Sequence, residues 1–82
     1  MKQTERLMGK TISYYDSFSG RSYSFVIERI EVLDDSIRVR PARDHWGVFI
    51  EKSDLGELLA SGFVIKTSTL EGCTLQEEWF IR

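Results

Sequence analysis

The chain has few of the residues that cross-link a fold through disulfides or bind a metal ion. Its 82 residues include one cysteine, Cys73, one histidine, His45, and one proline. A single cysteine cannot form an internal disulfide, which excludes a secreted disulfide scaffold. One cysteine and one histidine are too few ligands for a zinc site within one chain. We therefore expect no metal site and no cofactor.

Long apolar runs are also missing. The N-terminal residues MKQTERLMGK contain no apolar stretch of signal-peptide length. No segment approaches the ~20 consecutive apolar residues that a membrane-spanning helix needs. We expect a soluble, cytoplasmic protein that does not contact a membrane.

The charges nearly balance but are unevenly distributed. Eleven Lys and Arg residues against thirteen Asp and Glu residues give a net charge of −2, which argues against a dedicated nucleic-acid binder. Residues 36–43 contain three arginines and no acid, whereas residues 67–81 contain three glutamates and no base. Two surfaces of opposite sign suit recognition of a partner or self-association.

The pattern of the chain is mainly β. Its length suits a single domain over residues 1–82, and β-branched and aromatic residues fill the segments between turn signals. We predict an α+β fold with five or six short antiparallel strands, in a strongly bent sheet or a small SH3-like barrel. One short helix over about residues 53–61 precedes a C-terminal hairpin. Ser53 or Asp54 is expected to cap this helix, with Asp54 and Glu57 as a capping box, and Gly62 to end it.

A long strand over residues 21–33 contains a phase slip. Apolar residues alternate up to Ile27, but the next one, Ile30, follows three positions later. Because a strand has a period of two, we expect a bulge or a sharp bend near residues 28–29.

Two-residue turns predict two hairpins, 29–33 with 36–40 and 63–70 with 73–81. The first places Arg29 opposite Arg40, and Glu31 opposite Arg38. The second pairs Phe63 with Phe80 on a face that the helix either covers or leaves exposed.

Catalysis is not expected. Cys73, His45 and Asp44 are the residue types of a thiol-protease triad, but Cys73 lies beside a tight turn without a flanking signature. We interpret Cys73 as a small buried side chain. Trp46 and Trp79 lie in phase with apolar neighbours, which favours a core role for both.

The candidate binding residues are cationic or aromatic side chains without an obvious place in the core: Phe18, Arg29, Arg38, Arg40, Arg43 and His45. Solvated charge is the competing interpretation of the arginines, and Phe18 can equally fold back over a sheet edge. We predict a small non-catalytic intracellular module that binds another protein, as an adaptor, inhibitor or assembly subunit of the kind that phages or mobile elements encode. Paired strand edges would also allow a homo-oligomer. The alternative function is binding of nucleic acid or nucleotide phosphate by Arg29, Arg38, Arg40 and Arg43.

Overall fold

A computed structural model describes residues 3–43 and 46–82. In this part of the chain the fold is mainly β with one short α-helix, as the sequence predicts. The described strands are β1 (Thr11–Asp16), β2 (Ser22–Val26), β3 (Arg29–Val32), β4 (Ser36–Arg40), β5 (Val48–Glu51), β6 (Phe63–Leu70) and β7 (Cys73–Ile81). The helix α1 (Lys52–Ser61) joins β5 to β6, and a short 3-10 helix, η1 (Gln3–Leu7), precedes β1.

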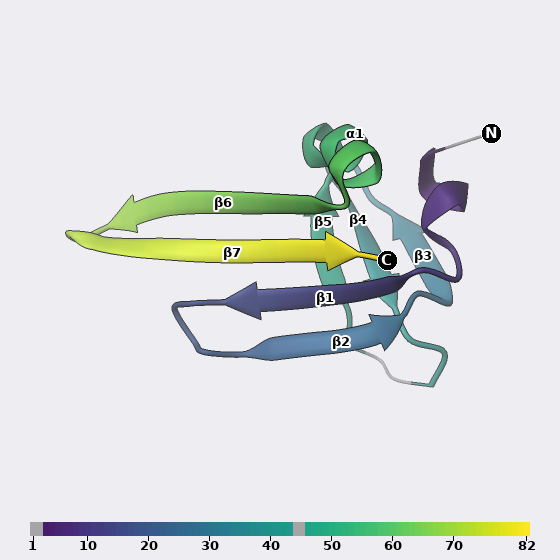
Figure 1. The fold of residues 1–82 in the computed structure, drawn as a ribbon, viewed down its shortest axis with the longest axis horizontal. Helices are drawn as coiled ribbons and strands as arrows, with labels where there is room; N and C mark the ends of the chain where they lie inside the picture. Colours follow the sequence, from purple (N-terminus) through teal and green to yellow (C-terminus); the bar gives the residue numbers. More distant parts are fainter. Residues whose placement is uncertain (1–2, 44–45) are drawn as a thin grey trace.

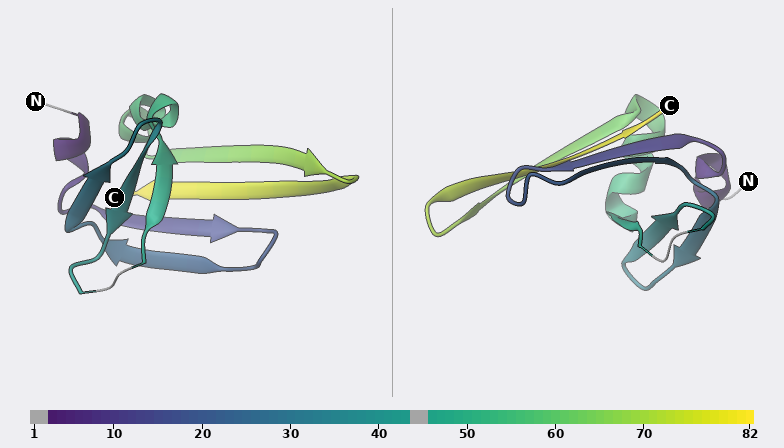
Figure 2. Two further views of the ribbon diagram at one scale, coloured as in Figure 1. Left: turned by 180° about the vertical axis from the view of Figure 1, so that it is seen from behind. Right: turned by 90° about the horizontal axis from the view of Figure 1, so that it is seen from below.

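The described strands form two antiparallel sheets and no closed barrel. The longer sheet has the order β2-β1-β7-β6, and the shorter sheet has the order β3-β4-β5. The shorter sheet crosses under one end of the longer sheet, and α1 lies on that same side (Figures 1 and 2). The longer sheet therefore has an inner face that is partly covered and an outer face that no other described element covers.

The predicted phase slip is the point where the chain changes sheets. The Ile27 amide donates to the Lys10 carbonyl of the longer sheet at 2.9 Å, whereas the Glu28 amide donates to the Arg40 carbonyl of the shorter sheet at 3.0 Å. Ile27 is fully buried at this corner. The expected bend is confirmed, and it splits the predicted strand 21–33 into β2 and β3.

Both predicted hairpin registers are confirmed. Arg29 lies opposite Arg40 and Glu31 opposite Arg38 in the first hairpin, and Phe63 lies opposite Phe80 in the second. The turn of the second hairpin has positive φ angles at Glu71 (51°) and Gly72 (81°). Positive φ at both positions is typical of the primed turns that fit the twist of two-residue hairpins.

The N-terminus of α1 differs from its prediction. The helix begins at Lys52, its N-cap is Glu51, and no side chain caps it, so the predicted capping box is wrong. The Asp54 carboxylate instead lies 2.8 Å from the Lys66 ammonium, because a partner on the adjacent strand competes with the helix end. The C-terminus agrees with the prediction, since Gly62 has φ 85° and its amide donates to Leu58.

The core fills the space between the two sheets and α1. Its buried residues are Leu7, Ile12, Ile27, Ile37, Val39, Val48, Ile50, Leu55, Leu58, Val64 and Trp79. Trp79 therefore has the predicted core role. Trp46 is 40 % exposed and lies at the margin, with its ring 4.9 Å from Tyr23 and 5.0 Å from Phe25 between centroids.

Cys73 is exposed, so its interpretation as a buried residue is wrong. The β6–β7 hairpin extends well beyond the shorter sheet (Figure 2), and no described element packs against the inner face at its tip. Leu70, which pairs with Cys73, is 59 % exposed for the same reason. Alternation placed both residues on the correct face, but only the part of that face near the shorter sheet is covered.

Candidate binding surfaces

Three of the predicted arginines share the outer face of the shorter sheet. Ile37 and Val39 of β4 are fully buried, so the alternate residues Arg38 and Arg40 point away from the core. Arg29 joins them from β3, directly opposite Arg40. We call Arg29, Arg38 and Arg40 the arginine face.

The aliphatic stems of the arginine face are packed against the chain. The Arg38 guanidinium lies 5.8 Å from the centre of the Phe49 ring, a cation–π distance. A Cβ atom at Gly47 would lie only 2.7 Å from the Arg40 Cγ and 2.7 Å from the Val39 carbonyl oxygen. Gly47 therefore permits a close approach of the backbone to these stems. The signal in the sequence was a glycine inside a strand-like segment, which often marks such an approach.

Two arginines of this face lie opposite each other. Within residues 3–43 and 46–82, both distances of ion-pair length belong to Lys66, which lies 2.9 Å from Glu51 and 2.8 Å from Asp54. Arg29 and Arg40 therefore face each other, and neither forms an ion pair with a described acid, although Glu31 lies on the same face opposite Arg38. Two facing guanidinium groups favour an anion between them.

The other predicted site residues are scattered. Arg43 is exposed in the loop after β4, and His45 lies outside the described residues. Phe18 is 74 % exposed in the β1–β2 turn, at the far end of the longer sheet from the arginine face (Figure 1). The structure thus brings Arg29, Arg38 and Arg40 together and leaves Phe18 apart.

The turn that carries Phe18 is ordered by the side chain of Asp16. The Phe18 amide donates to Asp16 Oδ1 at 2.9 Å, and the Ser19 hydroxyl donates to Asp16 Oδ2 at 3.1 Å. Asp commonly stabilises turns in this way. The ring is therefore displayed on a defined backbone and does not fold back over the sheet.

The outer face of the longer sheet carries a second group of exposed side chains. Phe63 and Phe80 stack with their ring centres 6.2 Å apart, and Ile65 follows on the same side of β6. Tyr15 lies across Glu78 from Ile65 on the same face. These four residues are each 39–47 % exposed, and we call Tyr15, Phe63, Ile65 and Phe80 the outer apolar face. The Phe63–Phe80 pair is therefore exposed rather than covered by the helix.

The inner face of the longer sheet carries polar groups that are already paired. The Tyr14 hydroxyl donates to Glu77 Oε2 at 2.7 Å. Burial, followed by this hydrogen bond, raises the pKa of the Tyr14 phenol above its ordinary value. Hydrogen bonds to Asp54 and Glu51 likewise raise the pKa of Lys66. The Lys66 contacts join the longer sheet to β5 and α1, whereas the Tyr14 contact joins β1 to β7, and both roles are structural.

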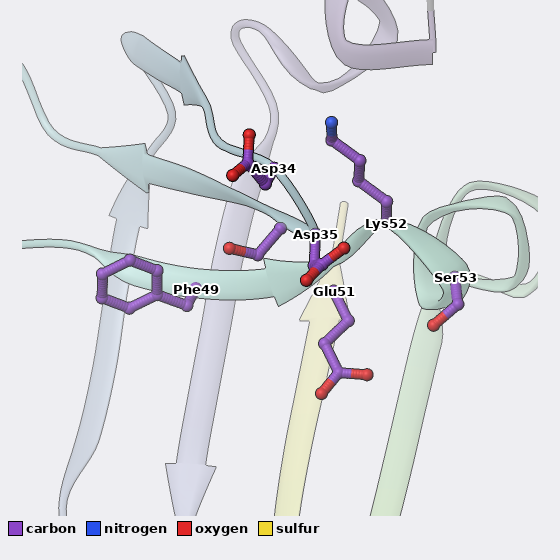
Figure 3. A pocket seen from close by; sticks show the side chains of 7 residues that line it. Asp34, Asp35, Phe49, Glu51, Lys52 and Ser53 are labelled. Carbon is purple, nitrogen blue, oxygen red and sulfur yellow. The ribbon is translucent and has the colours of Figure 1, made fainter.

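Acidic side chains line a depression beside the β3–β4 turn, but they do not point toward a common centre. Figure 3 shows Asp34, Glu51 and Phe49 pointing in different directions around it, and the Lys52 ammonium pointing away. In the described ranges no three His, Cys, Asp or Glu residues could together hold a metal ion. His45 and Asp44 are outside those ranges, so the structure does not place a cysteine–histidine–aspartate set.

Comparisons of the chain with protein-family models, curated proteins and solved structures found no match. No relative therefore guides the choice between the two surfaces. No helix in the described residues is long and apolar enough to cross a membrane.

Proposed function

We propose that this chain is a non-catalytic binding module that contacts another protein through its outer apolar face. The observation that supports this proposal is the stacked Phe63–Phe80 pair, exposed beside Ile65 on a sheet face that no described element covers. Contiguous exposed apolar residues with a polar rim are typical of interaction sites. Polar groups lie next to these side chains, since Ser13 is opposite Phe80 and Glu78 lies between Ile65 and Tyr15.

The chemistry of this face suits a binding anchor. Aromatic side chains bury a large area and lose little conformational entropy, because only two side-chain torsions become fixed. Phe63 and Phe80 are already held against each other, so binding needs little further ordering. Phe18, on its ordered turn, offers a separate anchor at the end of the same sheet. An adaptor, an inhibitor that blocks a partner sterically, or an assembly subunit would each use such contacts, and the lone cysteine favours a cytoplasmic setting.

The second candidate function is binding of nucleic acid or nucleotide phosphate. It is favoured by Arg29 and Arg40, which face each other without an ion pair to a described acid, and by Arg43 in the loop after β4. Three or four phosphate contacts would give a log–log dependence of affinity on salt with a slope of roughly −2 to −4. Affinity for a phosphate-bearing ligand that ignored salt would exclude this function.

Affinity capture from native lysate, with and without nuclease, separates the two functions. The wild type is compared with Phe63→Ser/Ile65→Thr and with Arg29→Glu/Arg43→Glu, which change exposed residues only. We expect a stoichiometric protein that survives nuclease, is lost with the first variant and is kept with the second. Loss with the second variant only, together with release by nuclease, would replace the proposal by the nucleic-acid function. A denaturation curve for each variant controls for misfolding.

A further inference from the structure

We infer that β6 pairs edge to edge with β6 of a second copy of the chain, to make one continuous antiparallel sheet across two molecules. This inference goes beyond the proposed function, because it concerns a strand edge and a second copy rather than the outer apolar face and another protein. Each can fail without the other.

The hydrogen-bond pattern shows which main-chain groups of β6 are free. The Ile81 amide donates to the Gly62 carbonyl at 2.8 Å, so these opposite residues form a hydrogen-bonded pair. Such pairs alternate along an antiparallel ladder. The amide and carbonyl groups that point away from β7 therefore belong to Phe63, Ile65, Thr67 and Thr69. Within the described residues, none of these groups has a hydrogen-bond partner.

The β6 edge lacks the features that usually prevent pairing. It is eight residues long, contains no proline, and keeps an unbroken register with β7, which excludes a bulge. Its one charged side chain, Lys66, points to the inner face, where an unpaired charge would oppose docking. Two carboxylates, Glu51 and Asp54, already neutralise that charge. A long and regular edge of this kind, with its one charge neutralised, is a template for another strand.

The opposite edge of the longer sheet is a weaker template. β2 has five residues and ends at the corner where the chain changes sheets. The same analysis of its ladder, from the bond of Ile27 to Lys10, leaves Ser22, Ser24 and Val26 with outward groups. Two of these three are serines, which bury little apolar area. Of the two edges of the longer sheet, β6 is therefore the one that favours a second copy.

The position of Lys66 separates two symmetric registers. A twofold axis at Lys66 would place the two copies of that lysine opposite each other. An axis at Thr67 instead pairs Lys66 with Ser68, Val64 with Leu70, and Ile65 with Thr69 of the second copy. The exposed Leu70 then gains an apolar neighbour.

The Thr67-centred register also fits the shape of the molecule and the outer apolar face. Toward the β6–β7 turn, β6 extends away from α1 (Figure 1), so most of the paired segment lies clear of the helix. Ile65 and Thr67 carry both the outward main-chain groups and side chains of the outer face. Pairing therefore joins the outer apolar faces of the two copies into one surface.

Light scattering after size exclusion, over a range of concentrations, tests the association. We expect the wild type to approach twice its chain mass of 9.5 kDa. Thr67→Pro removes an outward amide that the hairpin itself does not use, and should weaken the dimer at least tenfold. Ser24→Pro removes the equivalent amide on the β2 edge and should leave the dimer unchanged. A wild type that stays monomeric at several hundred micromolar, or a dimer that Ser24→Pro weakens as much as Thr67→Pro, would overturn the inference.

Cysteine crosslinking tests the register without depending on the proline variant. In a Cys73→Ser background, Thr67→Cys places two thiols opposite each other at the axis, where Cα atoms of paired strands are about 5.5 Å apart and a disulfide can form. Mild oxidation should crosslink Thr67→Cys faster than Lys66→Cys or Ile65→Cys. Faster crosslinking at either of the other positions would overturn the Thr67-centred register.

Discussion

The two faces of the longer sheet are built from alternate residues of the same strands, yet they differ sharply in burial. On the inner face Ile12, Val64 and Trp79 are buried, whereas on the outer face Phe63 and Ile65 are exposed. The inner face is covered by the shorter sheet and α1, which lie on one side only (Figure 2). Residues of similar hydrophobicity therefore stabilise the fold on one face and remain available for contact on the other.

The outer face of the shorter sheet can be compared with the outer face of the longer sheet. No other described element covers that face either, but it groups Arg29, Arg38 and Arg40 around one exposed ring, Phe49, which lies 5.8 Å from the Arg38 guanidinium. Long charged side chains of this kind keep a sheet face compatible with water. The longer sheet instead exposes a stacked pair of aromatic rings, Phe63 and Phe80. This difference favours the outer apolar face over the arginine face as the main binding surface.

Isoleucine truncation on the two faces should give the largest difference. Ile12 is fully buried and Ile65 is 47 % exposed. We expect Ile12→Ala to lower the free energy of unfolding by about 2–5 kcal/mol, because it removes buried methyl groups and leaves a cavity. Ile65→Ala should cost less than about 1 kcal/mol. Urea denaturation of both variants measures the difference, and equal losses would show that the outer face is covered in solution.

A glycine in the shorter sheet should show the next largest effect. At Gly47 an added Cβ would meet the Val39 carbonyl oxygen, a backbone atom that cannot move aside. We expect Gly47→Ala to destabilise the fold by about 1–3 kcal/mol through overpacking. Gly56→Ala is the control, since a Cβ at that position in α1 would meet only the Gln3 Nε2 atom, at an ordinary van der Waals distance of 3.8 Å. This control should stabilise the protein by roughly 0.5–1 kcal/mol, because alanine favours the helix. A neutral Gly47→Ala would mean that Gly47 does not lie close to the Arg40 side chain and the Val39 carbonyl oxygen.

Local features of this fold were predictable from the sequence. Both hairpin registers follow from two-residue turns combined with alternation, since a shift of one residue would move every apolar side chain to the wrong face. The phase slip before Ile30 likewise marked the corner between the sheets. The facing positions of Arg29 and Arg40 follow from the same register.

The sequence did not reveal which parts of each sheet face are covered, because this depends on the length and position of the elements that pack against the face. Cys73 and Leu70 are exposed because the shorter sheet stops short of the hairpin tip, a length that no local pattern encodes. The predicted capping of α1 failed because Asp54 pairs with Lys66 on a neighbouring strand. The sequence also did not decide whether the Phe63–Phe80 face is covered or exposed, because alternation does not say which face a helix will cover.

The β6–β7 turn tests the part of the hairpin that no other element supports. Gly72 has φ 81°, and an added Cβ would meet nothing within 4 Å, so only the backbone conformation opposes substitution. We expect Gly72→Val to cost about 1 kcal/mol or more. Gly72→Asn should cost less, because asparagine tolerates positive φ. An unchanged denaturation midpoint for Gly72→Val would show that the overhanging hairpin frays without loss of stability.

Two adjacent tyrosines, one on each face of the longer sheet, should show the smallest difference in stability. Tyr14 lies on the inner face and donates to Glu77, whereas the hydroxyl of Tyr15, on the outer face, has no hydrogen-bond partner in the described part of the chain. We expect Tyr14→Phe to lose about 0.5–1.5 kcal/mol at pH 7 and Tyr15→Phe to lose less.

The pH dependence of this loss identifies its cause. The fold raises the pKa of the Tyr14 phenol, so it favours the neutral form. That stabilisation is complete below pH ~10, where an unfolded tyrosine titrates, and is lost as the pH rises through the higher pKa of the folded state. The difference between wild type and Tyr14→Phe should therefore shrink above pH 10. Lys66, whose pKa is also raised, adds a parallel alkaline loss to all three proteins and cancels in their comparison. A Tyr14→Phe difference that persisted at high pH would mean that the loss does not come from the proton that the Tyr14 hydroxyl donates to Glu77.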